Sequence, residues 1–169
     1  FQKIVNMVKD ADAVIFVGGI SPRLEGEQMS VDIDGFMGGD RTSIELPAVQ
    51  RNLIKTLHDA GKKVIFVSLS GSALGLVPES ESCDAILQAW YPGQEGGTAV
   101  ADVLFGDYNP AGRLPVTFYK NVQQLPDFSD YSMKNRTYRY FKGEPLFPFG
   151  YGLSYTEFKY GKAKQSANM

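Results

Sequence analysis

Apolar residues along the chain form short continuous runs that alternate with runs at helical spacing. Two continuous runs, residues 13–17 and 63–68, are rich in β-branched residues and predict buried strands of a parallel sheet. Between them, apolar positions from 49 to 57 recur at helical spacing. Pro47 precedes this stretch and Gly61 follows it, where these residue types commonly begin and end helices. This strand–helix–strand unit predicts a right-handed crossover.

The alternation continues along the chain. A helix is predicted over residues 4–8, a strand over 85–90 and a second long helix over 98–105. Residues 113–118 predict another strand, and Pro115 places it at an edge because proline has no N–H for a central ladder. Strands that alternate with helices favour an α/β fold, with an open, mostly parallel sheet sandwiched by helices.

Two segments break the pattern. Residues 18–43 show no period, exceed the usual length of a loop and follow the first strand, so we expect them at the carboxyl edge of the sheet, where open α/β folds bind ligands. Residues 119–160 hold more than half of the aromatic residues. Disordered segments are poor in aromatics, so we expect an ordered, aromatic-rich C-terminal wrap. We predict one domain over 1–160 and a polar tail or linker over 161–169.

Composition narrows the chemistry. The 169 residues include 17 Lys+Arg and 19 Asp+Glu, and the net charge of −2 gives no electrostatic footprint for nucleic acid or an anionic membrane. No apolar run is long enough to span a membrane. The lone Cys83 and lone His58 argue against a disulfide framework, a Cys- or His-based metal site and a Ser-His-Asp triad. We therefore expect no metal and no cofactor, and chemistry by carboxylates, hydroxyls and backbone groups.

The long loop carries the first candidate residues. Glu25 and Glu27 lie two positions apart around a glycine, and either can supply a general acid or base. An acidic surface loop is the plain alternative. Asp40 and Arg41 follow two glycines and can form an ion pair that closes the loop or a clamp for sugar hydroxyls.

A second candidate lies between the strand at 85–90 and the helix at 98–105, again at the carboxyl edge. Trp90 offers an apolar face on which a sugar ring can stack. Gly96 and Gly97 would let backbone N–H groups meet a ligand at a helix N-terminus, although close helix–strand packing explains them equally well. Neither glycine-rich nucleotide fingerprint occurs, so a nucleotide or phosphate site has little support.

Three long strings together resemble glycoside hydrolase family 3: Trp-Tyr-Pro-Gly-Gln-Glu-Gly-Gly at 90–97, the run at 101–118, and Phe-Pro-Phe-Gly-Tyr-Gly-Leu-Ser-Tyr-Thr at 147–156. The resemblance covers roughly residues 12–158. The loop at 24–29, with Gly-Gly-Asp-Arg-Thr at 38–42, is most similar to the bacterial β-xylosidase branch.

The resemblance implies an exo-acting, retaining β-glycosidase that acts on oligo- or aryl-β-glycosides. In that family a (β/α)8 barrel carries the aspartate nucleophile, and nothing in this sequence resembles the barrel. The α/β sandwich domain lends the acid/base glutamate, for which Glu27 is the first choice and Glu25 the second. Asp40 and Arg41 match an Asp-Arg pair expected to shape the loop, and Glu95 is expected to be structural.

The resemblance also sets further expectations. Without the nucleophile, this chain alone is expected to hydrolyse nothing at a useful rate, and its loop glutamate is expected to titrate near the ordinary value. A non-catalytic sugar-binding module that uses Trp90 is the alternative. Polysaccharide breakdown fits a periplasmic or secreted location. The chain begins at Phe1 with no signal-like segment, so we expect any such signal to lie upstream.

Overall fold

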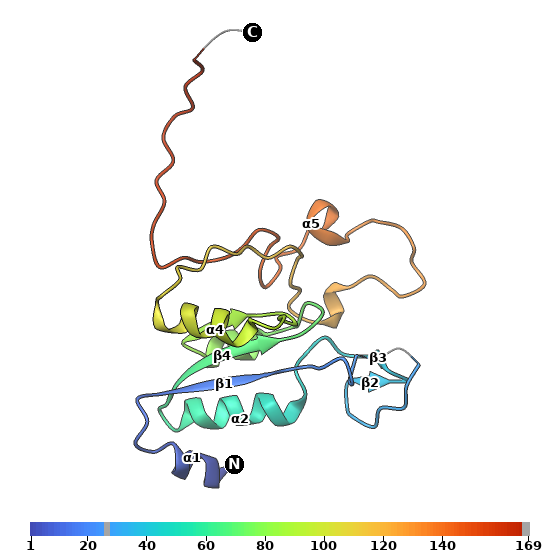
Figure 1. Ribbon diagram of the computed structural model, residues 1–169. Coiled ribbons are helices and arrows are strands. Elements are labelled where there is room, and N and C mark those ends of the chain that lie inside the picture. The colour runs from blue at the N-terminus through green and yellow to red at the C-terminus, as the bar shows by residue number, and fades with distance from the viewer. Residues whose placement is uncertain (26–27, 167–169) are drawn as a thin grey trace.

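The computed structural model describes residues 1–25 and 28–166. Its central element is a three-stranded parallel sheet, in the order β1 (Ala13–Gly19), β4 (Lys63–Leu69) and β5 (Ala85–Gln88). Ala13 pairs with Lys63 and Ile65 with Ala85, so all three strands end at the same edge. The α/β fold predicted from the alternation is confirmed (Figure 1).

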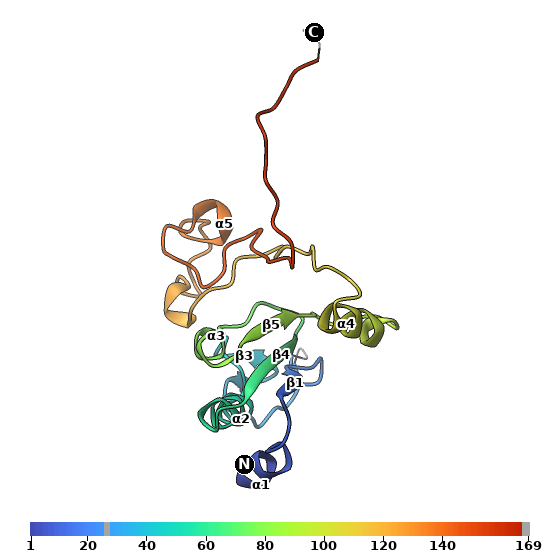
Figure 2. The ribbon, with the colours of Figure 1, turned by 90° about the vertical axis from the view of Figure 1, so that its left-hand side faces the viewer.

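Helices connect the strands. α1 (Gln2–Met7) precedes the sheet, α2 (Ala48–Asp59) and α3 (Val77–Ser82) flank β4, and α4 (Gly96–Phe105) follows β5. The hydrophobic pattern predicted three of these helices, whereas the helix at Val77–Ser82 was not predicted. In two perpendicular views α1 and α2 lie on one side of the sheet and the chain after α4 lies on the other (Figures 1 and 2). α4 ends at Gly106, whose left-handed φ of 85° favours glycine.

The core lies between α2 and the sheet. Ile54 and Leu57 from α2 are buried against Val64 and Phe66 from β4. Burying such side chains is the main source of stability for a domain of this size. Val49, which shares the helical pattern, is exposed because it lies at the start of the helix, away from this contact.

One predicted strand is wrong. Residues 113–118 form no strand, and Phe118 makes only an isolated antiparallel bridge to Phe147. Leu114 N donates to the Tyr151 carbonyl at 2.8 Å, and Gly150 N donates to the Leu114 carbonyl at 2.8 Å. Between Leu114 and Phe118, Pro115 interrupts the hydrogen bonding because it has no N–H.

The C-terminal wrap is ordered in part. Tyr138 stacks on Phe149 with ring centroids 4.5 Å apart, and Phe147 stacks on Tyr151 at 5.0 Å. The wrap also includes the short helices η1 (Val122–Gln124) and α5 (Thr137–Tyr140). Residues 157–166 are exposed and extend away from the rest of the chain (Figures 1 and 2). The division into a domain and a tail at residue 160 stays a prediction.

Candidate active site

Three loops meet at the carboxyl edge of the sheet. The first follows β1, the second follows β4 and the third follows β5. The first loop leads to the hairpin β2 (Phe36–Met37) and β3 (Asp40–Arg41), which the sequence pattern did not predict. Figure 1 shows this hairpin beyond the end of β1. This edge is where open α/β sheets bind their ligands.

A single carboxylate joins the three loops. Glu25 Oε1 accepts a hydrogen bond from Ser72 Oγ at 2.5 Å. Glu25 Oε2 accepts one from the Gly71 N–H at 3.1 Å and another from the Tyr91 hydroxyl. Arg41 Nη1 lies 3.9 Å from Glu25 Oε1 and donates to Ser72 Oγ at 2.8 Å. We call Glu25, Arg41, Gly71, Ser72 and Tyr91 the Glu25 clamp.

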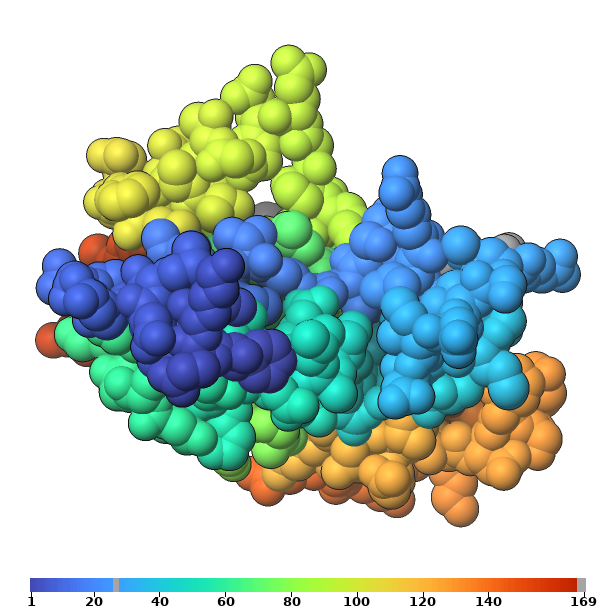
Figure 3. Space-filling model, turned by 90° about the horizontal axis from the view of Figure 1, so that it is seen from below, coloured from blue at the N-terminus to red at the C-terminus, as the bar shows by residue number. Residues whose placement is uncertain are grey.

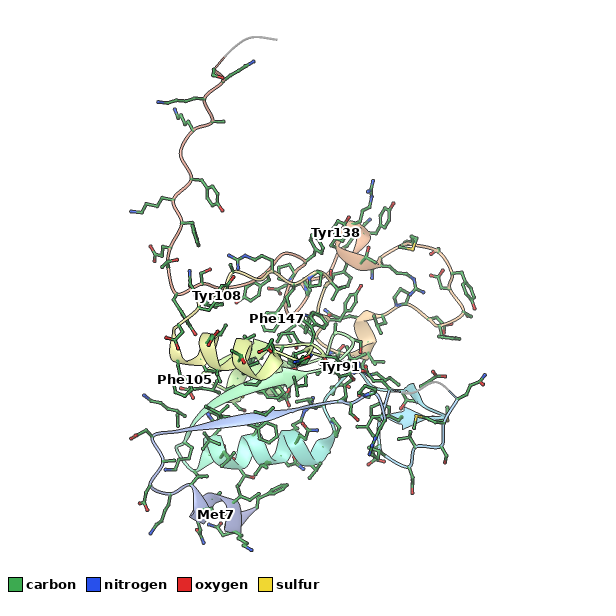
Figure 4. All side chains as sticks on the ribbon, viewed as in Figure 1. Met7, Tyr91, Phe105, Tyr108, Tyr138 and Phe147 are labelled. Atoms are coloured by element: carbon green, nitrogen blue, oxygen red, sulfur yellow. The ribbon has the colours of Figure 1, made fainter. Side chains whose placement is uncertain are left out.

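The local backbone is built to bring Tyr91 over Glu25. Trp90, two residues after the end of β5, has a left-handed φ of 57°, which is uncommon for a large side chain. Gly71 leaves space for the phenol, since a Cβ at that position would lie 2.7 Å from the Tyr91 ring. Figure 4 shows Tyr91 at the end of the sheet nearest the hairpin. A side chain at position 71 would therefore separate Tyr91 from Glu25.

The clamp keeps Glu25 ionised. Burial alone would raise the pKa of Glu25, but the hydrogen bonds from Ser72, Tyr91 and Gly71, with the Arg41 charge, outweigh it and lower that pKa. Burial and the Glu25 carboxylate raise the pKa of Tyr91 to about 12, so the phenol stays a donor. The ordinary titration expected for the loop glutamate is therefore not found at Glu25.

The other predicted residues lie around this clamp. Glu27 lies outside the described residues. Arg41 pairs with Glu25 rather than with its neighbour Asp40, which is exposed in the hairpin. Trp90 is half-buried and forms a T-shaped pair with Phe118, with the ring centroids 5.9 Å apart. Glu95 occupies the N-cap position of α4 without a side-chain bond to the helix backbone, and its Oε2 accepts from the Thr98 hydroxyl at 3.2 Å.

Three clamp residues, Gly71, Ser72 and Tyr91, were not singled out from the sequence as site residues. Tyr91 entered only as part of the string at 90–97. Their position in the sequence could have indicated them, because these residues follow strands that end at the same edge as the loop of Glu25.

Cys83 is half-buried, and burial with the nearby Glu79 and Asp84 carboxylates raises its pKa to about 12. Such a thiol is unreactive at neutral pH.

Two further findings concern the described residues alone. Within 1–25 and 28–166, no three His, Cys, Asp or Glu side chains come together as a group that could hold a metal ion. None of the helices described there is long and apolar enough to cross a membrane.

The fold and the clamp define an α/β domain with a carboxylate site at the carboxyl edge of its parallel sheet. Residues 1–155 match the family model described as "Glycosyl hydrolase family 3 C-terminal domain". The chain belongs to this family and is therefore, at the level of the family, part of a glycoside hydrolase.

Named relatives agree with this family. Over 99% of its length the chain is 69% identical to a "Xylan 1,4-beta-xylosidase" of Xylanibacter ruminicola, of which it covers 19%. Over 93% of its length it is 43% identical to a "Periplasmic beta-glucosidase" of Salmonella typhimurium, of which it covers 21%. The chain therefore spans about a fifth of the length of these relatives.

Solved structures show the same fold. A beta-glucosidase from Kluyveromyces marxianus superposes with a TM-score of 0.77 at 29% identity, over 94% of this chain and 19% of that one. A beta-glucosidase from Listeria innocua in complex with gluconolactone gives 0.72 at 29% identity, over 94% of this chain and 22% of that one. The predicted resemblance to glycoside hydrolase family 3 is confirmed.

Proposed function

We propose that this chain is the domain that supplies the acid/base glutamate to an exo-acting, retaining β-glycosidase. The substrates proposed are terminal β-linked sugars of xylosides or glucosides. The 69% identity to a protein named xylan 1,4-beta-xylosidase favours xylosides. The nucleophile would be an aspartate from a (β/α)8 barrel outside this chain, so the chain alone would be inactive.

The proposed reaction divides the work between two carboxyl groups. In a retaining glycosidase one attacks the anomeric carbon and the other protonates the departing oxygen, at a separation of about 5 to 5.5 Å. The donor must hold its proton near neutral pH, which requires a raised pKa. It then acts as a base toward the water that releases the sugar.

The Glu25 clamp is the observation on which the choice of proton donor rests. The pKa of Glu25 is lowered, and hydrogen-bond donors already occupy both of its oxygens. Such a carboxylate is poorly suited to give a proton and well suited to fix a loop. We therefore assign the acid/base role to Glu27, two positions along, and a positioning role to Glu25. Glu25 as the donor is the alternative.

The roles of the remaining predicted residues are also proposals. Arg41 would hold the loop through Glu25 and Ser72, and Asp40 would shape the hairpin. Glu95 would have a structural role at the start of a helix without transferring a proton. Trp90 would contact substrate only through whatever part of its ring the contact with Phe118 leaves open. A periplasmic or secreted location is proposed because one relative is named periplasmic.

Activity of the full-length protein tests the proposal. It should hydrolyse aryl β-xyloside or aryl β-glucoside, whereas residues 1–169 alone should not. Activity of the isolated chain would contradict a shared active site. The full-length protein could instead hydrolyse neither substrate and bind xylo-oligosaccharides. If Trp90→Ala then abolishes that binding, the chain is a sugar-binding module.

A further inference from the structure

A second ordered loop lies beside the hairpin. We call residues 126–133 the aromatic loop. Its backbone is held by its own polar side chains: the Asp127 carboxylate accepts from the Ser129 N–H at 2.8 Å, and the Asp130 carboxylate accepts from the Ser132 N–H at 2.8 Å. Arg136 Nε donates to the Ser132 carbonyl at 3.0 Å. These bonds give the loop a defined shape without a hydrophobic core of its own.

Two aromatic rings project from this loop into solvent. Phe128 is 94% exposed and Tyr131 is 88% exposed. Large aromatic side chains bury roughly 150 to 250 Å² when they are covered, at roughly 25 cal/mol per Å². A ligand that covers either ring therefore gains binding free energy at a site whose backbone is already ordered.

Phe128 and Tyr131 line a hollow that Arg41 of the Glu25 clamp also lines. This hollow of about 660 Å³ separates the aromatic loop from the residues after β3, and Arg41, Thr42, Phe128, Tyr131 and Arg136 are among its lining residues. Figure 1 shows the two segments stacked at one end of the molecule, and Figure 3 shows their surfaces side by side. Arg41 belongs to both places, since its other contacts are with Ser72 and Glu25.

The charges in the hollow indicate a neutral ligand. Two arginines, Arg41 and Arg136, and two aspartates, Asp127 and Asp130, line the same hollow, and Arg41 is also paired with Glu25. An anionic ligand such as a phosphate would meet two carboxylates there. A sugar is neutral, carries an apolar C–H face that stacks on aromatic rings, and carries hydroxyls that exchange hydrogen bonds with carboxylates and guanidinium groups.

We propose that Phe128 and Tyr131 form a platform for the sugar units on the leaving-group side of a β-linked oligosaccharide. This inference rests on the proposed function. The acid/base glutamate protonates the departing oxygen, so the leaving group lies beside the loop that carries it. The aromatic loop borders the same hairpin and is therefore placed to contact the next sugar units.

Two substrates separate this role from others in the full-length enzyme. One is a β-linked trisaccharide of xylose or glucose, and the other is the corresponding β-glycosyl fluoride, whose leaving group is a single atom. Phe128→Ala and Tyr131→Ala should each lower kcat/KM for the trisaccharide about tenfold, which corresponds to about 1.4 kcal/mol. Turnover of the fluoride should stay unchanged.

Matched variants serve as controls. Tyr131→Phe keeps the ring and should keep trisaccharide turnover. Tyr160→Ala removes a ring that is 95% exposed in the extended tail, away from the hollow, and should change neither substrate. Light scattering and thermal unfolding of each variant show whether assembly and folding are intact.

The outcomes are distinct. An equal fall for trisaccharide and fluoride, or a change in oligomeric state, would mean that the rings contact another domain or a second copy, and would overturn the platform. Unchanged trisaccharide turnover in both alanine variants would also overturn it. If the wild-type enzyme hydrolyses neither substrate, the proposed function itself fails. If the wild-type enzyme is active but the alanine variants show no selective loss of trisaccharide turnover, the proposed function stands and only the platform is overturned.

Discussion

Two carboxylate–arginine pairs in this domain differ in what surrounds them. Glu79, in α3, is 1% exposed, and its Oε1 accepts from Arg51 Nε of α2 at 3.0 Å. Its Oε2 has no hydrogen-bond partner among the described residues. The Glu25 side chain is 15% exposed, its Arg41 Nη1 lies farther away at 3.9 Å, and hydrogen-bond donors meet both of its oxygens.

The comparison separates a structural pair from one that we propose to position a loop. Glu79 joins two helices that pack on each other, and a buried charge with one partner makes removal of either side chain costly. Glu25 instead joins three loops at the edge where a ligand would bind. The first pair should therefore govern stability and the second should govern the geometry of catalysis.

The largest effect on stability is expected at Glu79. Glu79→Ala leaves the Arg51 charge half-buried without its carboxylate, and should reduce the free energy of unfolding by about 3 to 5 kcal/mol. Calorimetry of the domain transition in the full-length protein measures this. Asp59→Ala is the matched control, because its pair with Lys55 is exposed and should contribute about 0.5 kcal/mol or less. Equal effects of the two substitutions would remove the distinction.

The next effect is expected on turnover. Tyr91→Phe removes one hydrogen bond to Glu25 and leaves the ring in place, so kcat of the full-length enzyme should fall about tenfold with KM nearly unchanged. Tyr155→Phe is the control, since its hydroxyl donates to the Val103 carbonyl at 2.5 Å, outside the clamp. A Tyr91 variant with wild-type kcat would show that the clamp does not position the loop.

The smallest effect is expected in the pH dependence of stability. The pKa of Glu25 is lowered from 4.5 by folding, so its contribution is fully present above pH 4.5 and is lost as the pH falls through the lower folded value. As the pH falls from 4.5 through the lower folded value, Tm should fall more steeply in the wild-type protein than in Glu25→Gln. Parallel curves would mean that the carboxylate is not held in its charged form.

Sequence reasoning predicted the framework better than the site. The runs at 13–17 and 63–68 and the helix between them follow from hydrophobic period, which depends only on neighbouring residues. The strand expected at 113–118 was wrong because its bonding depends on residues 146–151, far along the chain. The hydrogen bonds to Glu25 in the clamp join residues 46 to 66 positions apart, which no local pattern reports.

Family resemblance supplied part of what period could not. It drew attention to the loop of Glu25 and Glu27 and to the Asp40–Arg41 pair, and the family itself is confirmed. It did not reveal that Arg41 pairs with Glu25, nor that Ser72 and Tyr91 complete the clamp. These partners were identified only from the structure, in which the strand ends lie at one edge of the sheet.

The central claim is that Glu27 transfers the proton while Glu25 stays an ionised anchor, and azide rescue tests it most directly. In the full-length enzyme, Glu27→Ala should lower turnover of an oligosaccharide about 10²- to 10⁴-fold. Azide should restore turnover of an activated aryl β-glycoside and give a glycosyl azide of retained configuration. The Glu25→Ala variant should also turn over substrate more slowly than wild type, but azide should not restore its turnover. Rescue of the Glu25 variant alone, or full activity in both, would contradict the account.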